Sequence, residues 1–213
     1  MSLVAIAWDI DGTLVDSEPL HHRALLAVCK NSHGVDLSDL PDQAFRGVQM
    51  SNVWLELRDR LPTSACEDDW LSAINSYYSD HRSELVAMPG AVQTIRTLKE
   101  LGALQVCVSN SARLIVDTNI DALGIRDCIL FSICRDDVTV GKPDPYPYLK
   151  ACRRLAVAPA QTLAVEDSQT GIRSARAAGL LVAGYSAVPW ENGEVDFNAY
   201  HLSEIIEVFQ RGQ

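Results

Sequence analysis

The feature that most constrains the fold is a regular alternation of apolar runs and amphipathic segments after residue 87. The runs have the length of strands, and the segments between them carry apolar residues at helical spacing. An earlier run at residues 3–8, LVAIAW, has the same character. The later runs are LQVCVS, LFSIC, TLAVED and LLVAGY. Strands that alternate with helices form right-handed βαβ units, so the sequence predicts an α/β fold with a parallel sheet.

Residues 16–86 interrupt this alternation, because they contain no comparable apolar run. Their apolar residues instead recur at the spacing of amphipathic helices. Three segments show this pattern: PLHHRALLAVCKNSHG, MSNVWLELRDRL and DDWLSAINSYYSDHRSEL. The sequence therefore predicts an inserted helical domain at 16–86, and a catalytic core formed by 1–15 together with 87–213.

Composition narrows the classes of partner. The chain has 213 residues, 47% of them hydrophobic, and a net charge of -10, which disfavours nucleic acid and anionic membranes. Six cysteines without C-x-x-C spacing indicate buried reduced thiols. With no leader pattern and no apolar run of membrane-spanning length, we expect a soluble cytoplasmic protein. The oligomeric state stays open, with a monomer among the alternatives.

Polar residues gather where the predicted strands end. In a parallel sheet, ligands bind beyond the carboxyl ends of the strands. In chain order the residues at these ends are Asp9 and Asp11, Ser109 and Asn110, Lys142, and Glu166 and Asp167. We therefore expect these side chains to converge on one edge of the sheet. Taken singly, Asp9 and Asp11 also fit a solvated turn, and Glu166 and Asp167 fit an acidic pair at a helix start.

Four converging carboxylates cannot all stay ionised without a counter-charge. Oxygen ligands favour Mg²⁺, and Lys142 supplies a second positive charge. Together with hydroxyl and amide donors, and with backbone N–H groups of the Gly12–Thr13 turn, this set would cradle a phosphate. One carboxylate could then attack as a nucleophile while its neighbour moves protons.

At this point the motifs DIDGTLVDS, VSNS, GKPDP and VEDSQTGI resemble the four ordered motifs of the haloacid dehalogenase superfamily of phosphohydrolases. The helical insertion after the first motif is similar to the cap of one branch. That branch includes phosphoglycolate phosphatases, sugar-phosphate phosphatases and β-phosphoglucomutase. The resemblance spans roughly residues 3–210 and implies a Rossmann-like three-layer α/β/α core with a helical cap.

The resemblance also implies roles for individual residues. Asp9 resembles the nucleophile and Asp11 the general acid and base, with Ser109 and Lys142 holding the phosphoryl group. Mg²⁺ would be bound by Asp9, the Asp11 carbonyl and Asp167, with Glu166 in or next to the coordination sphere. The expected substrate contacts come from Gly12, Thr13, His21, Gly47 and Asn110. The implied activity is Mg²⁺-dependent hydrolysis of a small phosphorylated metabolite through an aspartyl phosphate.

For several residues of the predicted cap, the sequence leaves more than one role open. His21 could face the substrate or be an ordinary helical histidine. The mutases of this branch carry an arginine three residues after the glycine that matches Gly47, but this chain has Met50 there. That difference favours a phosphatase over a phosphosugar mutase, although Arg46 could substitute. Trp54 and Trp70 fit the cap core better than a sugar-binding platform.

Three other activities are weighed against the phosphatase. Asp11 argues against the dehalogenases, which lack an acid at that position. Lys30 is the one lysine in the predicted cap helices and lies at a polar helix end, which disfavours phosphonate cleavage through a Schiff base. A receiver-like signalling module also uses a phosphorylated aspartate, Mg²⁺ and a lysine. Receivers place the phosphorylated aspartate on a later strand and have no helical insertion.

Overall fold

The computed structural model describes residues 2–41, 44–45, 48, 50–191 and 193–212. The chain separates into two compact units, Met1–Asp16 with Val86–Gln213, and Ser17–Leu85. Residues 16 and 86, which we expected in the insertion, belong to the first unit. There they pair with each other in an antiparallel ribbon of β2 (Val15–Asp16) and β3 (Val86–Ala87).

The first unit is built on a parallel sheet, as the sequence predicts. Among the described residues it has six strands in the order β5-β4-β1-β6-β7-β8. Their bounds are β1 Ala5–Trp8, β4 Leu104–Val108, β5 Ser132–Ile133, β6 Thr162–Glu166, β7 Leu181–Tyr185 and β8 Phe197–Ala199. The central strand β1 pairs in parallel with β4 on one side and with β6 on the other. The carboxyl ends of these three strands therefore meet at one edge.

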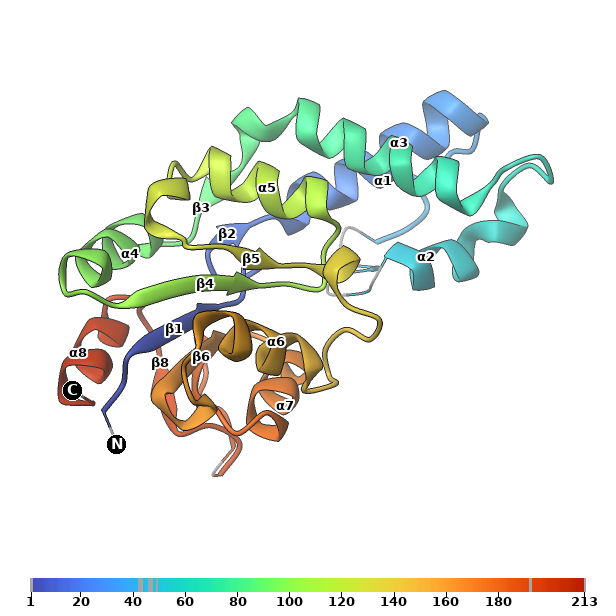
Figure 1. Cartoon of the computed structure of the whole chain (residues 1–213). Helices are drawn as coiled ribbons and strands as arrows, with labels where there is room; N and C mark the ends of the chain where they lie inside the picture. The colour runs from blue at the N-terminus through green and yellow to red at the C-terminus, as the bar shows by residue number, and fades with distance from the viewer. Residues whose placement is uncertain (1, 42–43, 46–47, 49, 192, 213) are drawn as a thin grey trace. The chain divides into compact units, whose positions relative to one another are not determined.

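Helices cover both faces of this sheet and complete three layers (Figure 1). Helices α6 (Tyr146–Leu155) and α7 (Gln169–Ala177) lie on one face. Helices α4 (Ala91–Glu100) and α5 (Arg113–Ala122) lie on the other, and α8 (Glu204–Arg211) packs against α4. The α/β/α architecture expected from the sequence is confirmed.

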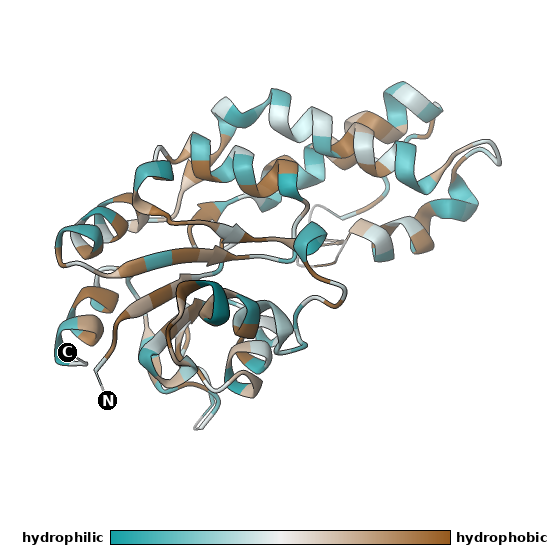
Figure 2. Cartoon of the chain, viewed as in Figure 1, coloured by the Kyte–Doolittle hydropathy of each residue, from teal (hydrophilic) through white to brown (hydrophobic). Residues whose placement is uncertain are grey.

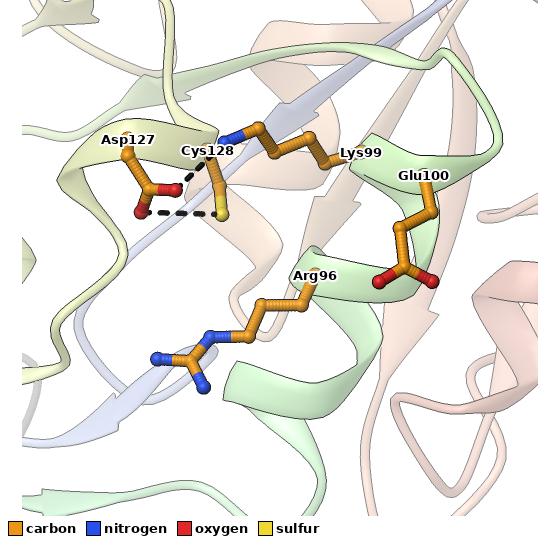
Figure 3. Close-up of a pocket in the computed structure, with 5 residues that line it drawn as sticks. All are labelled: Arg96, Lys99, Glu100, Asp127 and Cys128. Carbon is orange, nitrogen blue, oxygen red and sulfur yellow. Dashed lines mark hydrogen bonds and ion pairs between the residues drawn. The ribbon is translucent and has the colours of Figure 1, made fainter.

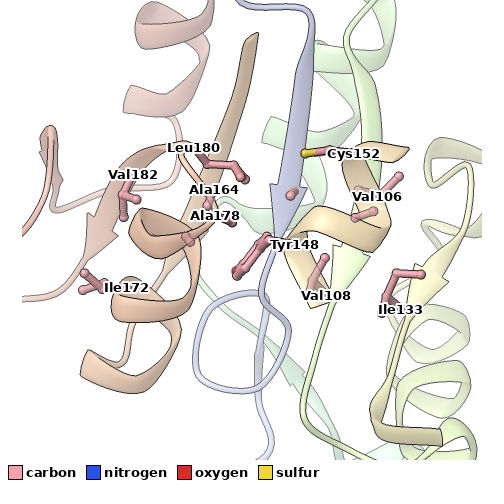
Figure 4. Close-up of a cluster of buried hydrophobic side chains, with 13 residues drawn as sticks. Val106, Val108, Ile133, Tyr148, Cys152, Ala164, Ile172, Ala178, Leu180 and Val182 are labelled. Atoms are coloured by element: carbon pink, nitrogen blue, oxygen red, sulfur yellow. The ribbon is translucent and has the colours of Figure 1, made fainter. Parts of the chain in front are cut away.

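Apolar residues of the strands and helices form the core of the first unit. Figure 2 shows hydrophobic colour along the central strands, whereas the helices carry both colours. Val106, Ala164 and Val182 of the strands form one buried cluster with Tyr148 of α6 (Figure 4). Burying such side chains contributes about 25 cal/mol per Å² of apolar surface. This packing fixes the strands whose ends carry the polar residues.

The second unit is helical and has a hydrophobic core of its own. Its helices are α1 (Glu18–His33), α2 (Met50–Leu57) and α3 (Glu67–Asp80). Gly34 caps the C-terminal end of α1 in the left-handed conformation that glycine tolerates. Trp70 is fully buried there and lies 5.5 Å from Trp54 between ring centroids. Trp70 is thus a core residue.

All six cysteines are free thiols. Five are buried, as expected for reduced thiols in a folded core, whereas Cys66 is exposed at the start of α3. Among the described residues, no helix combines the length and apolar character that crossing a bilayer requires.

Candidate active site

The candidate site begins where β1 ends. Asp9 follows the strand directly, and its N–H donates to the carbonyl of Val165 at 3.0 Å. Its side chain is largely buried. Because β1 lies between β4 and β6, residues from the ends of both neighbours can reach the segment that holds Asp9 and Asp11. The strand order therefore places the polar residues that follow β4 and β6 on either side of this segment.

Lys142 provides the positive charge at the site. Its Nζ lies 2.8 Å from Asp9 Oδ1 and 2.5 Å from Glu166 Oε1, and its side chain is only 3% exposed. Burial opposes the charged form, but ion pairing with Asp9 and Glu166 raises the pKa of Lys142 above its ordinary value. Lys142 is therefore a protonated lysine held between two carboxylates.

The backbone of Lys142 is held by Asn110 at the end of β4. Asn110 Oδ1 accepts from the Lys142 N–H at 2.8 Å, and Asn110 Nδ2 donates to the Lys142 carbonyl at 3.0 Å. Gly141 allows this approach, because a Cβ at that position would overlap the Asn110 amide. The side chain of Asn110 thus contacts Lys142, and its expected contact with substrate stays a prediction.

Asp9, Glu166 and Asp167 form a carboxylate cluster, in which Asp9 and Glu166 are buried and Asp167 is half-buried. One oxygen from each lies within 4.8 Å of the others. Burial, together with charge repulsion from Asp9, raises the pKa of Asp167 to about 8. Burial is also the main cause that raises the pKa of Glu166 to about 7, and it raises the pKa of Asp9 despite Lys142. The arrangement favours a further cation, and its all-oxygen donor set fits Mg²⁺.

Residues of α6 and of the N-terminal end of α7 contact the Glu166 carboxylate. The Tyr148 hydroxyl donates to Glu166 Oε1, and burial together with the charge of Glu166 raises the pKa of Tyr148. Ser168 Oγ lies 3.4 Å from Glu166 Oε2 and also caps α7 by accepting from the Gly171 N–H. A side chain at Gly171 would overlap the Glu166 carboxylate. These contacts fix Glu166 beside Lys142.

Asp11 directs its carboxylate away from this cluster. Its Oδ2 accepts from Ser111 Oγ at 2.7 Å and lies 3.3 Å from Ser109 Oγ. Its Oδ1 accepts from Asn119 Nδ2 at 3.1 Å. Two aspartates that lie two positions apart in sequence therefore have different partners, with Asp9 facing Lys142 and Asp11 facing the end of β4 and helix α5.

The backbone N–H groups of the Gly12–Thr13 turn were expected to be available to a phosphate, but both donate to carbonyls within the same loop. The Gly12 N–H donates to Val15 at 2.9 Å, and the Thr13 N–H donates to Ile10 at 3.2 Å. Gly12 has a φ of 82°, and a Cβ there would overlap the Asp167 carboxylate. Gly12 therefore allows Asp167 to approach. The Thr13 side chain is fully buried beside Asp9, and substrate contact by either residue stays a prediction.

The remaining expected residues belong to the helical unit. His21 lies on α1, where its ring stacks on Tyr78 with centroids 4.4 Å apart. Its expected contact with substrate stays a prediction. Gly47 and Arg46 lie outside the described residues.

Three residues at the site were missed by sequence reasoning. Ser111 and Asn119 contact Asp11, and Tyr148 contacts Glu166. Asn119 carried a usable signal, because it falls at helical spacing among the apolar residues of α5, where a buried amide needs a partner. Tyr148 looked like an ordinary core aromatic, and its hydroxyl gave no further signal.

A separate hollow of about 430 Å³ is lined by Arg96, Lys99, Glu100, Asp127 and Cys128 (Figure 3). It lies beside the C-terminal end of α4, which precedes the start of β4, whereas the polar residues above follow the strand ends. Lys99 is paired with Asp127 at 2.7 Å. None of the residues expected to be functional lines it.

The sequence of this chain matches a family model for haloacid dehalogenase-like hydrolases over residues 3–179. It is 28% identical over 180 residues to validoxylamine A 7'-phosphate phosphatase of Streptomyces hygroscopicus subsp. limoneus, covering 83% of each chain. It is 29% identical over 185 residues to a phosphoglycolate phosphatase of Thiobacillus denitrificans, covering 84% of this chain and 81% of the relative.

Solved structures share the fold. CbbY from Rhodobacter sphaeroides, crystallised in complex with phosphate, superposes with a TM-score of 0.85 at 25% identity. The match covers 95% of this chain and 96% of that chain. The similarity therefore includes both the parallel-sheet unit and the helical insertion.

Proposed function

Because this chain belongs to the haloacid dehalogenase-like hydrolase family, we propose that it is a Mg²⁺-dependent phosphatase of small phosphorylated metabolites. The observation that carries the proposal is the position of Asp9. Its buried carboxylate forms an ion pair with the protonated Lys142 and lies within 4.8 Å of oxygens of two further carboxylates, Glu166 and Asp167. The phosphatase names of the curated relatives support the same class of substrate.

The residues present fit a hard divalent cation. Asp9, Glu166 and Asp167 would hold Mg²⁺ through carboxylate oxygens, with the Asp11 carbonyl as a further ligand. When bound, Mg²⁺ neutralises phosphate charge and polarises a phosphoryl oxygen. Lys142 and the Ser109 hydroxyl bind the other phosphoryl oxygens and orient the group for in-line attack.

The reaction proceeds in two steps. Asp9 attacks phosphorus and forms an aspartyl phosphate, while the phosphorus–oxygen bond to the leaving alcohol breaks. Asp11 donates a proton to that leaving oxygen. In the second step Asp11 takes a proton from water as the water attacks phosphorus, which releases inorganic phosphate and restores Asp9. The helical unit, residues 17–85, is proposed as the cap that selects the leaving group.

A panel of phosphorylated metabolites, assayed for phosphate release with Mg²⁺ and with EDTA, tests this proposal. We expect release from at least one sugar phosphate or phosphoglycolate, and loss of release in EDTA. Turnover unaffected by EDTA, or no release from any ester, would overturn the proposal. Phosphorus NMR with β-glucose 1-phosphate and a bisphosphate primer separates hydrolysis from transfer. Formation of glucose 6-phosphate without free phosphate would identify a mutase instead.

A further inference from the structure

We propose that Asn119 is a positioning residue that fixes the carboxylate of Asp11 for proton transfer. The inference rests on the proposed function, because it concerns the acid and base of that reaction. Asn119 lies on α5 and is fully buried. Its Nδ2 donates to Asp11 Oδ1 at 3.1 Å, across 108 positions of sequence. The contact joins helix α5 to the loop that follows β1.

The two oxygens of Asp11 are held from different directions. Ser111, in the loop between β4 and α5, donates to Oδ2 at 2.7 Å. The Ser109 hydroxyl lies 3.3 Å from the same oxygen and also accepts from the Ser111 N–H at 3.0 Å. Asn119 is the residue that reaches Oδ1 from the helix. Donors at both oxygens fix the rotation of the carboxyl group as well as its position.

The burial of Asn119 within a helix indicates that its contact with Asp11 is functional. Asparagine is a poor residue for a helix interior, and an amide buried without a hydrogen-bond partner destabilises the fold. Asn119 nevertheless lies on the buried face of α5 with Val116 and Ile120. An apolar residue at this position would pack the same face and leave Asp11 Oδ1 without this donor.

Positioning matters for Asp11 because it moves a proton to one leaving oxygen and then from one water. A general acid or base must lie within hydrogen-bond reach of that proton, and such groups contribute roughly 10²–10⁴ to rate. A carboxyl group on a loop can rotate out of line. The neutral amide of Asn119 restrains that rotation and adds no charge beside Asp9 and Lys142.

The test compares two esters that differ in their need for an acid. p-Nitrophenolate leaves without protonation, whereas an alkoxide requires it. For Asn119→Leu we expect kcat/KM on the fastest alkyl phosphate of the metabolite panel to fall about 100-fold. With p-nitrophenyl phosphate the same constant should fall less than about threefold, since formation of the aspartyl phosphate needs no acid there.

Matched variants separate positioning from damage to the helix. Ile120→Ala removes volume from the same buried face, so it should lower stability without changing the ratio of the two constants. Asn119→Ser keeps a small polar group too short to reach Asp11, and it serves if the leucine variant does not fold. Ser111→Ala, which removes a donor from the other oxygen, should shift the ratio in the same direction as Asn119→Leu.

The inference is overturned if the two Asn119 variants lose activity equally on both esters, because a structural defect affects every substrate alike. It is also overturned if neither constant changes. These outcomes differ from failure of the proposed function, in which the wild-type enzyme hydrolyses neither ester with Mg²⁺. If the wild type hydrolyses both and only the ratio fails to change, the positioning role alone is wrong.

Discussion

The side-chain amide of Asn110 forms two hydrogen bonds with the backbone of Lys142, one to its N–H at 2.8 Å and one to its carbonyl at 3.0 Å. This pair joins the end of β4 to the loop after β5. It holds the residue whose Nζ contacts Asp9. The position of Lys142 therefore depends on a residue 32 positions earlier in the chain.

Asn110→Asp should lower kcat and stability together. The aspartate would place an oxygen against the Lys142 carbonyl where the amide now donates, which costs about 1–3 kcal/mol for a buried acceptor without its donor. Steady-state rates and urea unfolding measure both effects. Asn198→Asp is the matched control, because Asn198 Oδ1 accepts from the Trp190 N–H and an aspartate oxygen would accept the same bond. If both variants behave like the wild type, the role assigned to Asn110 is wrong.

Lys142→Met should abolish phosphatase activity and destabilise the fold by about 3–5 kcal/mol. The reason is that Asp9 and Glu166 would remain buried without their shared cation. Lys99→Met removes an exposed ion pair with Asp127 and should lower stability far less, because water already screens that pair. Chemical denaturation of both variants gives the comparison. Equal stability of the two would show that Lys142 is not a buried counter-charge.

Gly12→Ala should weaken Mg²⁺ binding much more than it weakens the fold. A methyl group there overlaps Asp167, and the left-handed backbone adds about 1–2 kcal/mol of strain. Gly34→Ala carries a similar backbone conformation with open space around the new methyl, so it reports the strain alone. Calorimetric titration with Mg²⁺ distinguishes them. Wild-type affinity in Gly12→Ala would contradict the placement of Asp167 in the metal site.

Mg²⁺ should bind more tightly at pH 8 than at pH 6. In the metal-free protein, burial raises the pKa of Glu166 to about 7 and that of Asp167 to about 8. Mg²⁺ needs the ionised carboxylates, so below these pKa values binding must displace protons, and affinity rises as pH rises. We expect roughly a tenfold or greater difference in Kd between the two pH values. Calorimetry in buffers of different ionisation enthalpy measures the protons released, and a Kd independent of pH would be contrary to this account.

Much of the site could be predicted because ligands of a parallel sheet bind beyond the carboxyl ends of its strands. Asp9, Lys142, Glu166 and Asp167 follow or end strands, and parallel topology brings those ends together. Asn119 could not be found this way, because it lies within a helix and its partner is 108 positions away. The strand β8, with the sequence FNA, was missed because three residues carry too little periodicity to be recognised. The β2–β3 ribbon was missed because its pairing spans the whole helical unit.

The central claim is that Asp9 is the nucleophile of a Mg²⁺-dependent phosphatase. The most direct measurement is the rate of p-nitrophenol release from p-nitrophenyl phosphate with Mg²⁺, for the wild type and for Asp9→Asn. Asp127→Asn, in an exposed ion pair, is the control for the same chemical change. We expect turnover by the wild type and the control, and none above background by Asp9→Asn. Turnover by Asp9→Asn at the wild-type rate would contradict the account.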